Sequence, residues 1–527
     1  MIPRNETLRM KRNLRRTWHT FFARFGRLLP IQAAAIPVVL AGKNAFLVSP
    51  TASGKTEAVI APLCERILAE DIRGLSVLYV TPTRALANDL YDRLNEQVRH
   101  LHLQIDIKTG DSPLLNWRNL PEIVITTPES FDSILCRHPG ALSKIEAVVL
   151  DEIHFLDGTY RGDQLRLLLK RLRNIKHNFS VYALSATVSN PEEVAARYAP
   201  GCEIIQVEGK RVFRESYVQT LEEVKEYAER EGLNKFLIFC NSRRRTEALA
   251  IEAKGIWRPG EIVVHHGSLH KKERIEAEET MRSARRAVCV STMTLEIGID
   301  IGDVDGVVLA DPPHDTSSFI QRIGRAGRRT GEIRMFALYD DNREIFEDLV
   351  AAARHNLLDE KVYREDPSVV VQQIFSTLYA NPSGVPLADL MAIFEGFCPH
   401  QSQVGRIIDH LRENDHIIQK VDRLYASEGV MNLGERGKVH SNIADSIGVL
   451  VIDSTRNREI GEIVLPAKIV REMRPFVLAG RVWSIEKAIR QRLYVRQIHA
   501  SAAPADFHQS TSLGAYFDYL PEDMQRR

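Results

Sequence analysis

The chain has 527 residues, of which 44% are hydrophobic and 26% are charged, and its formal net charge at pH 7 is +1. This length exceeds what one hydrophobic core supports, so we expect about three or four domains. The near-zero charge excludes binding of nucleic acid through a global positive field and leaves only local basic grooves. Six cysteines without a Cys-x-x-Cys pair argue against a disulfide framework or a zinc site and favour a reducing, cytoplasmic compartment. No apolar run reaches membrane-spanning length, so we expect no membrane partner.

The N-terminal segment is basic but lacks the apolar core of a signal peptide, and a solvated helix face is its simplest interpretation. Gln32 follows in a Pro-Ile-Gln sequence. A glutamine amide can both accept from and donate to one purine edge, which makes Gln32 a candidate adenine reader. Without its neighbours, Gln32 would more often be a surface residue at a helix start.

An apolar run at residues 45–48 predicts a buried strand, and it leads into Ser49-Pro-Thr-Ala-Ser-Gly-Lys-Thr56 and a helical pattern. A strand, a glycine-containing loop with Gly-Lys-Thr and a helix are the context of a phosphate-binding loop, in which backbone N–H groups face the phosphates. Lys55 would reach the β- and γ-phosphates, and the Thr56 hydroxyl would ligate Mg²⁺. An ordinary strand-to-helix turn is the alternative. The residues predicted to hold the nucleotide here are Ser53, Gly54, Lys55 and Thr56.

Apolar runs then alternate with helical patterns, which implies parallel sheets and the α/β class. We predict two such α/β domains in tandem. Polar clusters follow the carboxyl ends of the strands, where open α/β sheets place their ligand sites. The predicted strands are 75–80, 105–108, 122–126, 147–150 and 181–184 in the first series, and 235–240, 261–264, 287–290 and 306–309 in the second.

The pattern changes after the second series. Three helical stretches and a short hairpin predict a winged helix, with a plain helical cap as the alternative. Short strands separated by turn residues then predict a small β-barrel or curled sheet, and the final residues predict a loosely held tail. The predicted domains are 1–205, 206–362 (linker and second α/β domain), 363–430 (winged helix), 431–505 (β-rich module) and 506–527 (tail).

One predicted strand ends at Asp151-Glu-Ile-His154. Asp151 at a strand end is suited to hold Mg²⁺ through its water shell. Glu152 beside it is suited to orient and deprotonate an attacking water. A solvated loop is the alternative, and it is the better one when no phosphate loop lies upstream.

Four motifs, taken in their order, resemble the superfamily-two helicases over about residues 20–350. They are the phosphate loop, Asp151-Glu-Ile-His154, Ser185-Ala-Thr187 and Gln321-Arg-Ile-Gly-Arg-Ala-Gly-Arg328. The resemblance implies two RecA-like domains in tandem. In such proteins arginines of the second domain neutralise charge on the transferring phosphoryl group.

The resemblance assigns further roles residue by residue. Arg325 and Arg328 correspond to arginine fingers and Gln321 to a γ-phosphate sensor, although a surface salt bridge is the usual role of a single arginine. Gly298 and Asp300 match a motif near the ribose. His154, Ser185 and Thr187 would couple the nucleotide site to domain closure. The positions that match contacts to the nucleic-acid backbone are Thr83, Arg84, Thr109, Gly110, Thr127, Arg243, Gly267 and Thr292; an ordinary loop residue is the alternative for each.

Two segments, Leu295–Asp305 and Phe319–Arg328, look closest to the Lhr (large helicase-related) family core. Thr127-Pro-Glu-Ser130 stands where DEAD-box RNA helicases have Thr-Pro-Gly-Arg, and the resemblance extends to Leu433–Asn442 and Phe476–Trp483. The chain is shorter than usual family members. The predicted winged helix holds no tryptophan, so a strand-separating wedge would have to be another side chain. The candidates are Phe375, Phe394, Phe397 and Tyr425. A place in the hydrophobic core is the more typical role for each of them.

This resemblance implies an ATP hydrolase that uses ATP and Mg²⁺ and depends on single-stranded nucleic acid. It implies movement 3′ to 5′ on single-stranded DNA and separation of duplex DNA or RNA–DNA hybrid, with a role in DNA repair. A monomer suffices mechanically, and repair or defence proteins are the expected partners. Two alternatives remain. One is an RNA helicase, and the other is an ATP-gated clamp or remodeller that binds nucleic acid without unwinding it.

Overall fold

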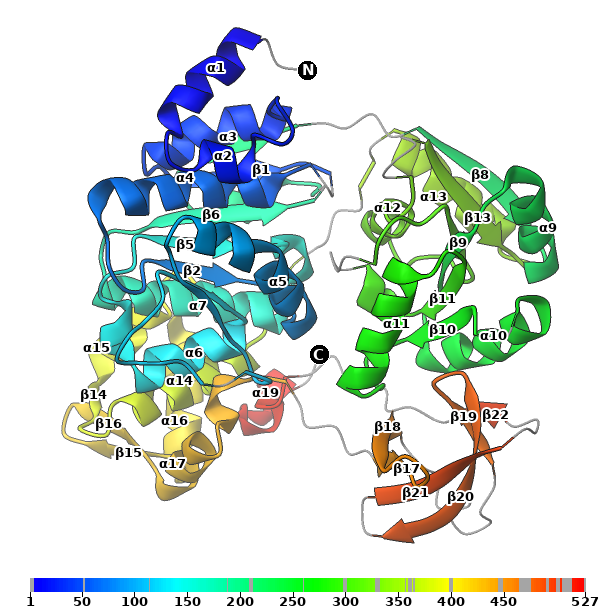
Figure 1. The fold of residues 1–527 in the computed structure, drawn as a ribbon. Coiled ribbons are helices and arrows are strands. Elements are labelled where there is room, and N and C mark those ends of the chain that lie inside the picture. Colours follow the sequence, from blue (N-terminus) through cyan, green and yellow to red (C-terminus); the bar gives the residue numbers. More distant parts are fainter. Residues whose placement is uncertain are drawn as a thin grey trace. The chain divides into compact units, whose positions relative to one another are not determined.

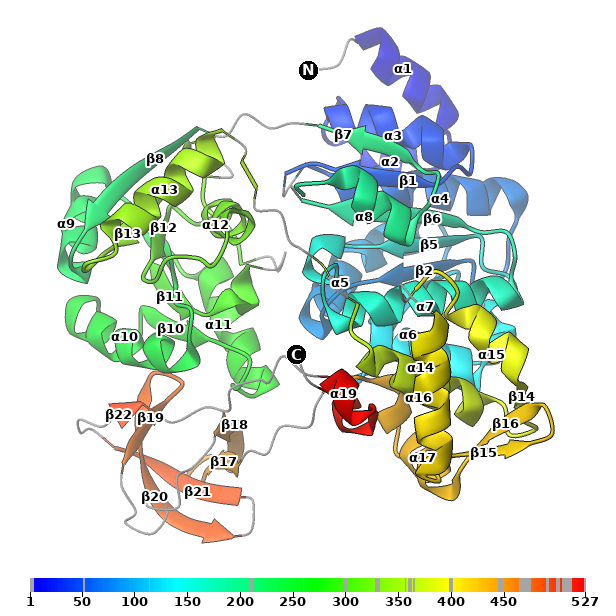
Figure 2. The same ribbon diagram turned by 180° about the vertical axis from the view of Figure 1, so that it is seen from behind.

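The computed structural model describes residues 4–50, 53–112, 114–186, 188–207, 212–258, 260–296, 301–327, 332–355, 357–358, 363, 365–397, 401–443, 449–463, 475–489, 492–498, 503–504 and 514–525. The chain divides into two compact units (Figures 1 and 2). The first contains Met1–Gly209, Glu360–Asp445 and Thr511–Arg527, and the second contains Lys210–Asp359 and Ser446–Ser510. None of the helices in the described ranges combines the length and the apolar character needed to cross a bilayer.

The first unit is built on a seven-stranded parallel sheet in the order β3-β4-β2-β5-β6-β1-β7. All six strands predicted from apolar runs are present. The central ones are buried on both faces, and the edge strand β3 buries Ile105 and Ile107. β7 was not predicted, since this edge strand exposes polar residues. The strands are β1 (Ala45–Val48), β2 (Val77–Val80), β3 (Ile105–Lys108), β4 (Ile123–Thr126), β5 (Ala147–Leu150), β6 (Ser180–Ser185) and β7 (Glu203–Gln206).

Helices cover both faces of this sheet (Figure 1), and each face has its own apolar core. One core joins the strands to α3 (Pro30–Leu40), α4 (Lys55–Glu70) and α5 (Arg84–His100). The other joins them to α6 (Pro128–Arg137), α7 (Tyr160–Ile175) and α8 (Pro191–Tyr198). The short elements of this part are α1 (Arg4–Asn13), α2 (Trp18–Phe21), η1 (Pro139–Leu142) and η2 (Ile153–Phe155).

A helical module packs beside α6 and α7 in the same unit (Figure 2). The first three of its four α-helices, with the three-stranded sheet β14-β16-β15, are the elements expected of a winged helix. Of the four aromatic residues considered as a wedge, Phe375, Phe394 and Phe397 are buried in the module core and Tyr425 packs over Gly384. The elements are α14 (Ser368–Ala380), β14 (Val385–Pro386), α15 (Leu387–Ile393), α16 (Gln401–Glu413), β15 (Ile417–Lys420), β16 (Arg423–Ala426), α17 (Glu428–Glu435) and η4 (Lys438–His440).

The prediction of a loosely held C-terminal tail is wrong for residues 514–525. Tyr516 and Leu520 are buried in the core of the helical module, and the Tyr516 N–H donates to the Asn442 side chain at 3.2 Å. Two short elements lie here, η5 (Phe517–Tyr519) and α19 (Glu522–Gln525). The chain therefore returns to the first unit after the β-rich module.

A buried polar cluster fixes α14 to α6 and α7. The Asp132 carboxylate accepts hydrogen bonds from Gln373 Nε2 at 2.6 Å and Gln372 Nε2 at 3.1 Å. Arg171 Nη1 lies 3.4 Å from Asp132 Oδ1 and donates to Ser376 Oγ at 3.0 Å. Burial alone would raise the pKa of Asp132, but the Arg171 charge and the hydrogen bonds hold that pKa below its ordinary value.

We expect Asp132→Ala to lower the free energy of unfolding by about 3–5 kcal/mol, because it leaves the Arg171 guanidinium buried without its carboxylate. Chemical denaturation followed by circular dichroism measures this change. Asp409→Ala on the exposed face of α16 is the matched control, with an expected change below about 0.5 kcal/mol. Equal effects of the two substitutions would contradict a stabilising role for the cluster.

The second unit is built on a six-stranded parallel sheet in the order β10-β11-β9-β12-β13-β8. The four predicted strands are present. β8 was missed because it lies in the predicted linker and mixes polar with apolar residues, and β13 pairs with it. The elements are β8 (Val212–Val218), α9 (Leu221–Glu231), β9 (Lys235–Phe239), α10 (Arg243–Ile256), β10 (Ile262–His265), α11 (Lys271–Ser283), β11 (Ala287–Ser291), η3 (Met293–Leu295), β12 (Gly306–Leu309), α12 (Thr316–Ile323), β13 (Glu332–Leu338) and α13 (Arg343–Arg354).

The β-rich module belongs to the second unit and forms a six-stranded sheet in the order β18-β17-β21-β20-β19-β22. Its Trp483 shares an apolar core with Phe236 of β9. The buried Glu247 carboxylate of α10 accepts from the backbone N–H groups of Ala479 and Gly480, each at 2.6 Å. The strands are β17 (Val449–Asp453), β18 (Arg458–Ile463), β19 (Phe476–Leu478), β20 (Arg481–Ile489), β21 (Arg492–Ile498) and β22 (Ala503–Pro504).

Candidate functional site

The phosphate-binding loop joins β1 to α4, and its shape requires glycine at position 54. Gly54 has φ 79°, and a Cβ there would lie 2.3 Å from Gln32 Nε2. The Lys55 ammonium donates to the carbonyls of Ser49 at 2.7 Å and Pro50 at 3.1 Å. The chain itself thus holds the Lys55 side chain within the loop, where backbone N–H groups at the start of α4 favour anions.

Gln32 is buried, with 6% of its surface exposed, so the alternative of a surface glutamine is wrong. Its Oε1 accepts from the Leu29 N–H at 2.9 Å, and its Nε2 lies 3.4 Å from the Gly54 carbonyl oxygen. Gln32 therefore connects the start of α3 to the phosphate-binding loop. Its position fits a nucleotide reader, which stays a prediction.

Asp151 and Glu152 follow β5. Glu152 adopts φ 45°, a left-handed backbone that is rare outside glycine and is often found at functional sites. Burial, and then the adjacent Glu152 charge, raise the pKa of Asp151 to about 7. Glu152 Oε2 is buried and accepts no hydrogen bond within the described residues. The pair thus concentrates negative charge that a divalent cation would neutralise.

Tyr79 of β2 was missed by sequence reasoning. Its hydroxyl donates to Asp151 Oδ2 at 2.9 Å and also interacts with the Thr56 hydroxyl. One phenol thereby brings together the two predicted Mg²⁺ ligands, and hydroxyl and carboxylate oxygens are the hard ligands that Mg²⁺ prefers. The signal in the sequence was one aromatic residue with a polar tip inside an otherwise aliphatic buried strand.

His154 and Ser185 lie together at the ends of β5 and β6. His154 Nδ1 lies 3.1 Å from Ser185 Oγ and accepts from the Ala186 N–H at 3.3 Å. This accepting role assigns the proton of a neutral imidazole to Nε2. The pair connects the segment of Glu152 to the neighbouring strand, as a coupling role requires. Thr187, predicted with them, lies outside the described residues.

Gln321, Arg322 and Arg325 of the arginine-rich segment are buried in the second unit. Arg322 forms an ion pair with Glu296, with 2.5 Å between Nε and Oε1, and Arg325 donates to the Glu296 carbonyl. Gln321 Nε2 lies 3.3 Å from Ser317 Oγ. Burial of Arg325 overturns a surface salt bridge as its role. Three predicted residues lie outside the described residues: Gly298, Asp300 and Arg328.

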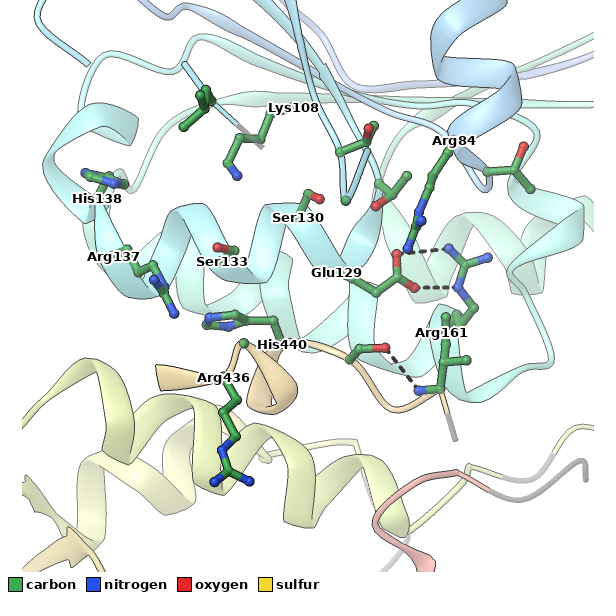
Figure 3. A pocket seen from close by; sticks show the side chains of 18 of the residues that line it. Arg84, Lys108, Glu129, Ser130, Ser133, Arg137, His138, Arg161, Arg436 and His440 are labelled. Carbon is green, nitrogen blue, oxygen red and sulfur yellow. Dashed lines mark hydrogen bonds and ion pairs between the residues drawn. The ribbon is translucent and has the colours of Figure 1, made fainter. Parts of the chain in front are cut away.

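A cavity of about 810 Å³ runs along α6 in the first unit (Figure 3). Five of the eight residues predicted to contact the nucleic-acid backbone line it. They follow the carboxyl ends of β2, β3 and β4, which explains why they converge. These five residues are Thr83, Arg84, Thr109, Gly110 and Thr127.

The contacts of these five residues differ. Arg84 Nη1 lies 2.7 Å from Asp111 Oδ1, and a Cβ at Gly110 would lie 2.8 Å from the Arg84 guanidinium. Thr83 caps α5 by accepting from the Leu86 N–H at 3.2 Å, so it has a structural role as well. The buried Thr109 hydroxyl has no hydrogen-bond partner within the described residues.

The helical module supplies the opposite wall of this cavity, with Arg436 and His440 among its side chains (Figure 3). Sequence reasoning missed this wall because it comes from a segment far from α6 in the chain. The cavity is basic: five cationic side chains line it against the two acidic side chains of Glu129 and Glu435, and Glu129 is paired with Arg161 at 2.6 Å. The cationic side chains are those of Arg84, Lys108, Arg137, Arg161 and Arg436.

The remaining three predicted contacts belong to the second unit. Arg243 Nη1 donates to Ser268 Oγ at 2.9 Å, and its Nη2 would lie 4.0 Å from a Cβ at Gly267. The Thr292 N–H donates to the His265 carbonyl at 3.2 Å, which places Thr292 beside the same strand end. Burial lowers the pKa of Arg243. The structure therefore groups these three residues at neighbouring strand ends of one sheet.

Two family models match the chain. The DEAD/DEAH box helicase model matches residues 29–194, and the model of the helicase conserved C-terminal domain matches residues 218–330. The two matches correspond to the two parallel sheets and include both groups of predicted site residues. They support the predicted RecA-like architecture.

Curated relatives are named as Lhr-core helicases. The chain is 29% identical over 582 residues to ATP-dependent helicase Lhr-Core protein 2 of Thermococcus barophilus, covering 97% of the chain and 66% of the relative. It is 32% identical over 348 residues to ATP-dependent helicase Lhr-Core of Sulfolobus acidocaldarius, covering 58% of the chain and 40% of the relative. The chain therefore spans less than two thirds of the length of these relatives.

Solved structures share the fold. Helicase Lhr of Mycobacterium smegmatis, bound to single-stranded DNA and AMP-PNP, matches with a TM-score of 0.70 and 26% identity over 82% of this chain and 62% of that one. The DUF1998 helicase MrfA bound to DNA matches with a TM-score of 0.72 and 22% identity over 92% of this chain and 73% of that one. Because the sequence identity of the second match is only 22%, this match supports the fold alone.

Proposed function

We propose that this chain, which belongs to the superfamily-two helicases and resembles their Lhr-type members, hydrolyses ATP and uses the energy to move along single-stranded nucleic acid. The observation that carries the proposal is the cluster around the Tyr79 hydroxyl. There the phosphate-binding loop meets a buried carboxylate of raised pKa and a second carboxylate on a strained backbone. Such a combination suits phosphoryl transfer better than an ordinary strand-to-helix turn.

The residues of the loop bind and orient the triphosphate. Lys55 exchanges its bonds to the Ser49 and Pro50 carbonyls for bonds to phosphate oxygens, and the N–H groups at the start of α4 contribute further donors. Thr56 and Asp151 would hold Mg²⁺, which when bound neutralises charge on the phosphates. Tyr79 positions these two ligands by hydrogen bonding to both.

Glu152 takes the proton from the attacking water. Its Oε2 accepts no hydrogen bond within the described residues. His154 Nδ1 lies 3.5 Å from this oxygen, but it is an acceptor itself and does not compete for the oxygen. The left-handed backbone at Glu152 sets the direction of the side chain. Arg325, Arg328 and Gln321 are proposed to act on the γ-phosphate, with Gly298 and Asp300 near the ribose, on the strength of the motif resemblance.

The basic cavity along α6 is proposed to bind the backbone of one strand. Hydroxyl, backbone and guanidinium donors at strand ends suit phosphates, which position a strand without specifying its sequence. We propose single-stranded DNA as the track, movement from 3′ to 5′, and separation of duplex DNA or RNA–DNA hybrid in DNA repair. The Lhr structure bound to single-stranded DNA supports the first of these.

Displacement of a labelled strand from tailed duplexes tests this proposal. Substrates carry a 3′ or a 5′ tail and are made of DNA or of an RNA–DNA hybrid. ATP-dependent displacement only from 3′-tailed substrates is the expected result. Displacement only from 5′ tails would contradict the polarity. Stimulated hydrolysis without any displacement would identify an ATP-gated clamp, and preference for RNA tracks would identify an RNA helicase.

A further inference from the structure

We propose that Trp117 and His138 form a stacking platform for one unpaired base of the strand bound along α6. The two rings stack with centroids 3.5 Å apart and an angle of 16° between their planes, and both line the basic cavity. The inference rests on the proposed function, because it requires single-stranded nucleic acid in this cavity. It adds a base contact to a surface whose other proposed contacts are to the backbone.

The platform is fixed by its surroundings. Trp117 is half-buried and packs on the apolar core between the sheet and α6, and Leu115 of the same segment is buried in that core. His138 ends α6, and its N–H donates to the Ile134 carbonyl at 2.9 Å before η1 begins. Binding a base therefore costs little ordering of either ring, which favours affinity.

The platform is an aromatic pair flanked by cations. Burial, and then the nearby charges of Lys108 and Arg137, lower the pKa of His138, which favours its neutral imidazole. Arg137 donates to the Gly434 carbonyl at 2.9 Å, which fixes its guanidinium between α6 and the helical module. A stacking surface beside cationic side chains is the arrangement that binds single strands without reading their sequence.

The platform and two of the predicted backbone contacts, Arg84 and Thr127, lie toward opposite ends of α6. Figure 3 places Lys108, Arg137 and His138 at one end of the helix and Arg84, Glu129 and Arg161 at the other. The ten residues of α6 span about 15 Å. A strand held by its phosphates near Thr127 can therefore continue along the helix and present a later base to Trp117.

A nucleobase is the occupant that the lining favours. The excess of cationic side chains attracts a polyanion, and every base offers a π-face to an indole or imidazole. A peptide would need apolar pockets or acidic side chains of its own to match this cavity. A purely structural Trp117–His138 contact is the competing explanation, and dependence of binding on a base at one position of the strand separates the two.

The test measures binding of fluorescein-labelled single-stranded DNA to the full chain by anisotropy. We expect Trp117→Ala to weaken binding by about 5- to 100-fold and Trp117→Phe, which keeps a ring, to weaken it less. A single abasic nucleotide moved along the oligonucleotide should weaken binding of the unchanged protein at one position, and Trp117→Ala should abolish that position dependence. A structural role would not produce a base-dependent signal.

Controls keep the outcomes distinct. Circular dichroism should show that Trp117→Ala is folded, with a lower melting temperature because Trp117 packs on the apolar core. His138→Ala probes the other ring and should reproduce the loss if Trp117→Ala fails to fold. Equal DNA affinity and an identical abasic profile in the unchanged protein and both alanine variants would overturn the platform alone. Absence of DNA binding by the unchanged protein would overturn the proposed function and the platform together.

Discussion

Lys55→Ala is expected to abolish ATP turnover, with a loss of at least about 100-fold in the rate of hydrolysis. Only 7% of the Lys55 surface is exposed, and its ammonium bonds to two loop carbonyls, so its charge is already directed to the place of the phosphates. Alanine removes the cation that stabilises charge on the transferring group. Steady-state hydrolysis at saturating single-stranded DNA measures the effect.

Lys43→Ala is the matched control, because Lys43 is an exposed lysine just before β1 and outside the loop. It should hydrolyse ATP at the unchanged rate, and both variants should melt at the same temperature as the parent. Turnover by Lys55→Ala within about twofold of the parent would refute the assignment of the phosphate-binding loop.

Glu152→Gln is expected to stop hydrolysis while leaving ATP binding intact, with a loss of about 100- to 10,000-fold in rate. Glutamine has the same shape as glutamate but cannot take the proton of the attacking water. The substitution also removes one of the two adjacent negative charges, so the raised pKa of Asp151 should fall toward its ordinary value. A fluorescent ATP analogue measures binding, and phosphate release measures turnover.

Glu146→Gln provides the control for the second prediction. Glu146 lies just before β5, at the opposite end of the same strand, and pairs with Lys176 at 3.0 Å. Its replacement should leave both binding and turnover unchanged. A Glu152→Gln protein that turns over normally would show that another group is the base, and one that no longer binds ATP would show that Glu152 serves binding.

The central strands of the first sheet could be predicted from the sequence, and so could the edge strands β3 and β10, whereas the polar edge strands β7 and β8 could not. β1, β2, β4, β5 and β6 are buried along their whole length, so they read as continuous apolar runs. β7 and β8 carry charged and polar residues at the edges of their sheets. Pairing with a neighbour, which a local pattern does not contain, decides that such segments are strands.

The nucleotide site could be located from the sequence because its residues lie in short motifs at strand ends. Gln32 and Gly54, for example, are in contact as the motif order suggests. Tyr79 could not be found in this way, since its role depends on the neighbouring strand β5 that supplies Asp151. Motif resemblance identifies residues that recur in related sequences. A hydrogen bond between two strands can be recognised only once the sheet is folded.

The wall of the cavity and the C-terminal segment depend on tertiary contacts. His440 reaches α6 only because the helical module packs on the first domain, and Gln164 Nε2 donates to the His440 carbonyl at 2.8 Å across this contact. Tyr516 is buried by the same module. Neither placement has a local signal, so one was missed and the other was wrongly predicted as a tail.

ATP hydrolysis without nucleic acid, with single-stranded DNA and with single-stranded RNA is the measurement that tests the central claim most directly. Coupling of the site around Tyr79 to a strand in the basic cavity predicts that single-stranded DNA stimulates hydrolysis by the unchanged chain. The same DNA should not stimulate Glu152→Gln. Hydrolysis that neither DNA nor RNA stimulates would contradict the assignment of this chain as a nucleic-acid-dependent motor.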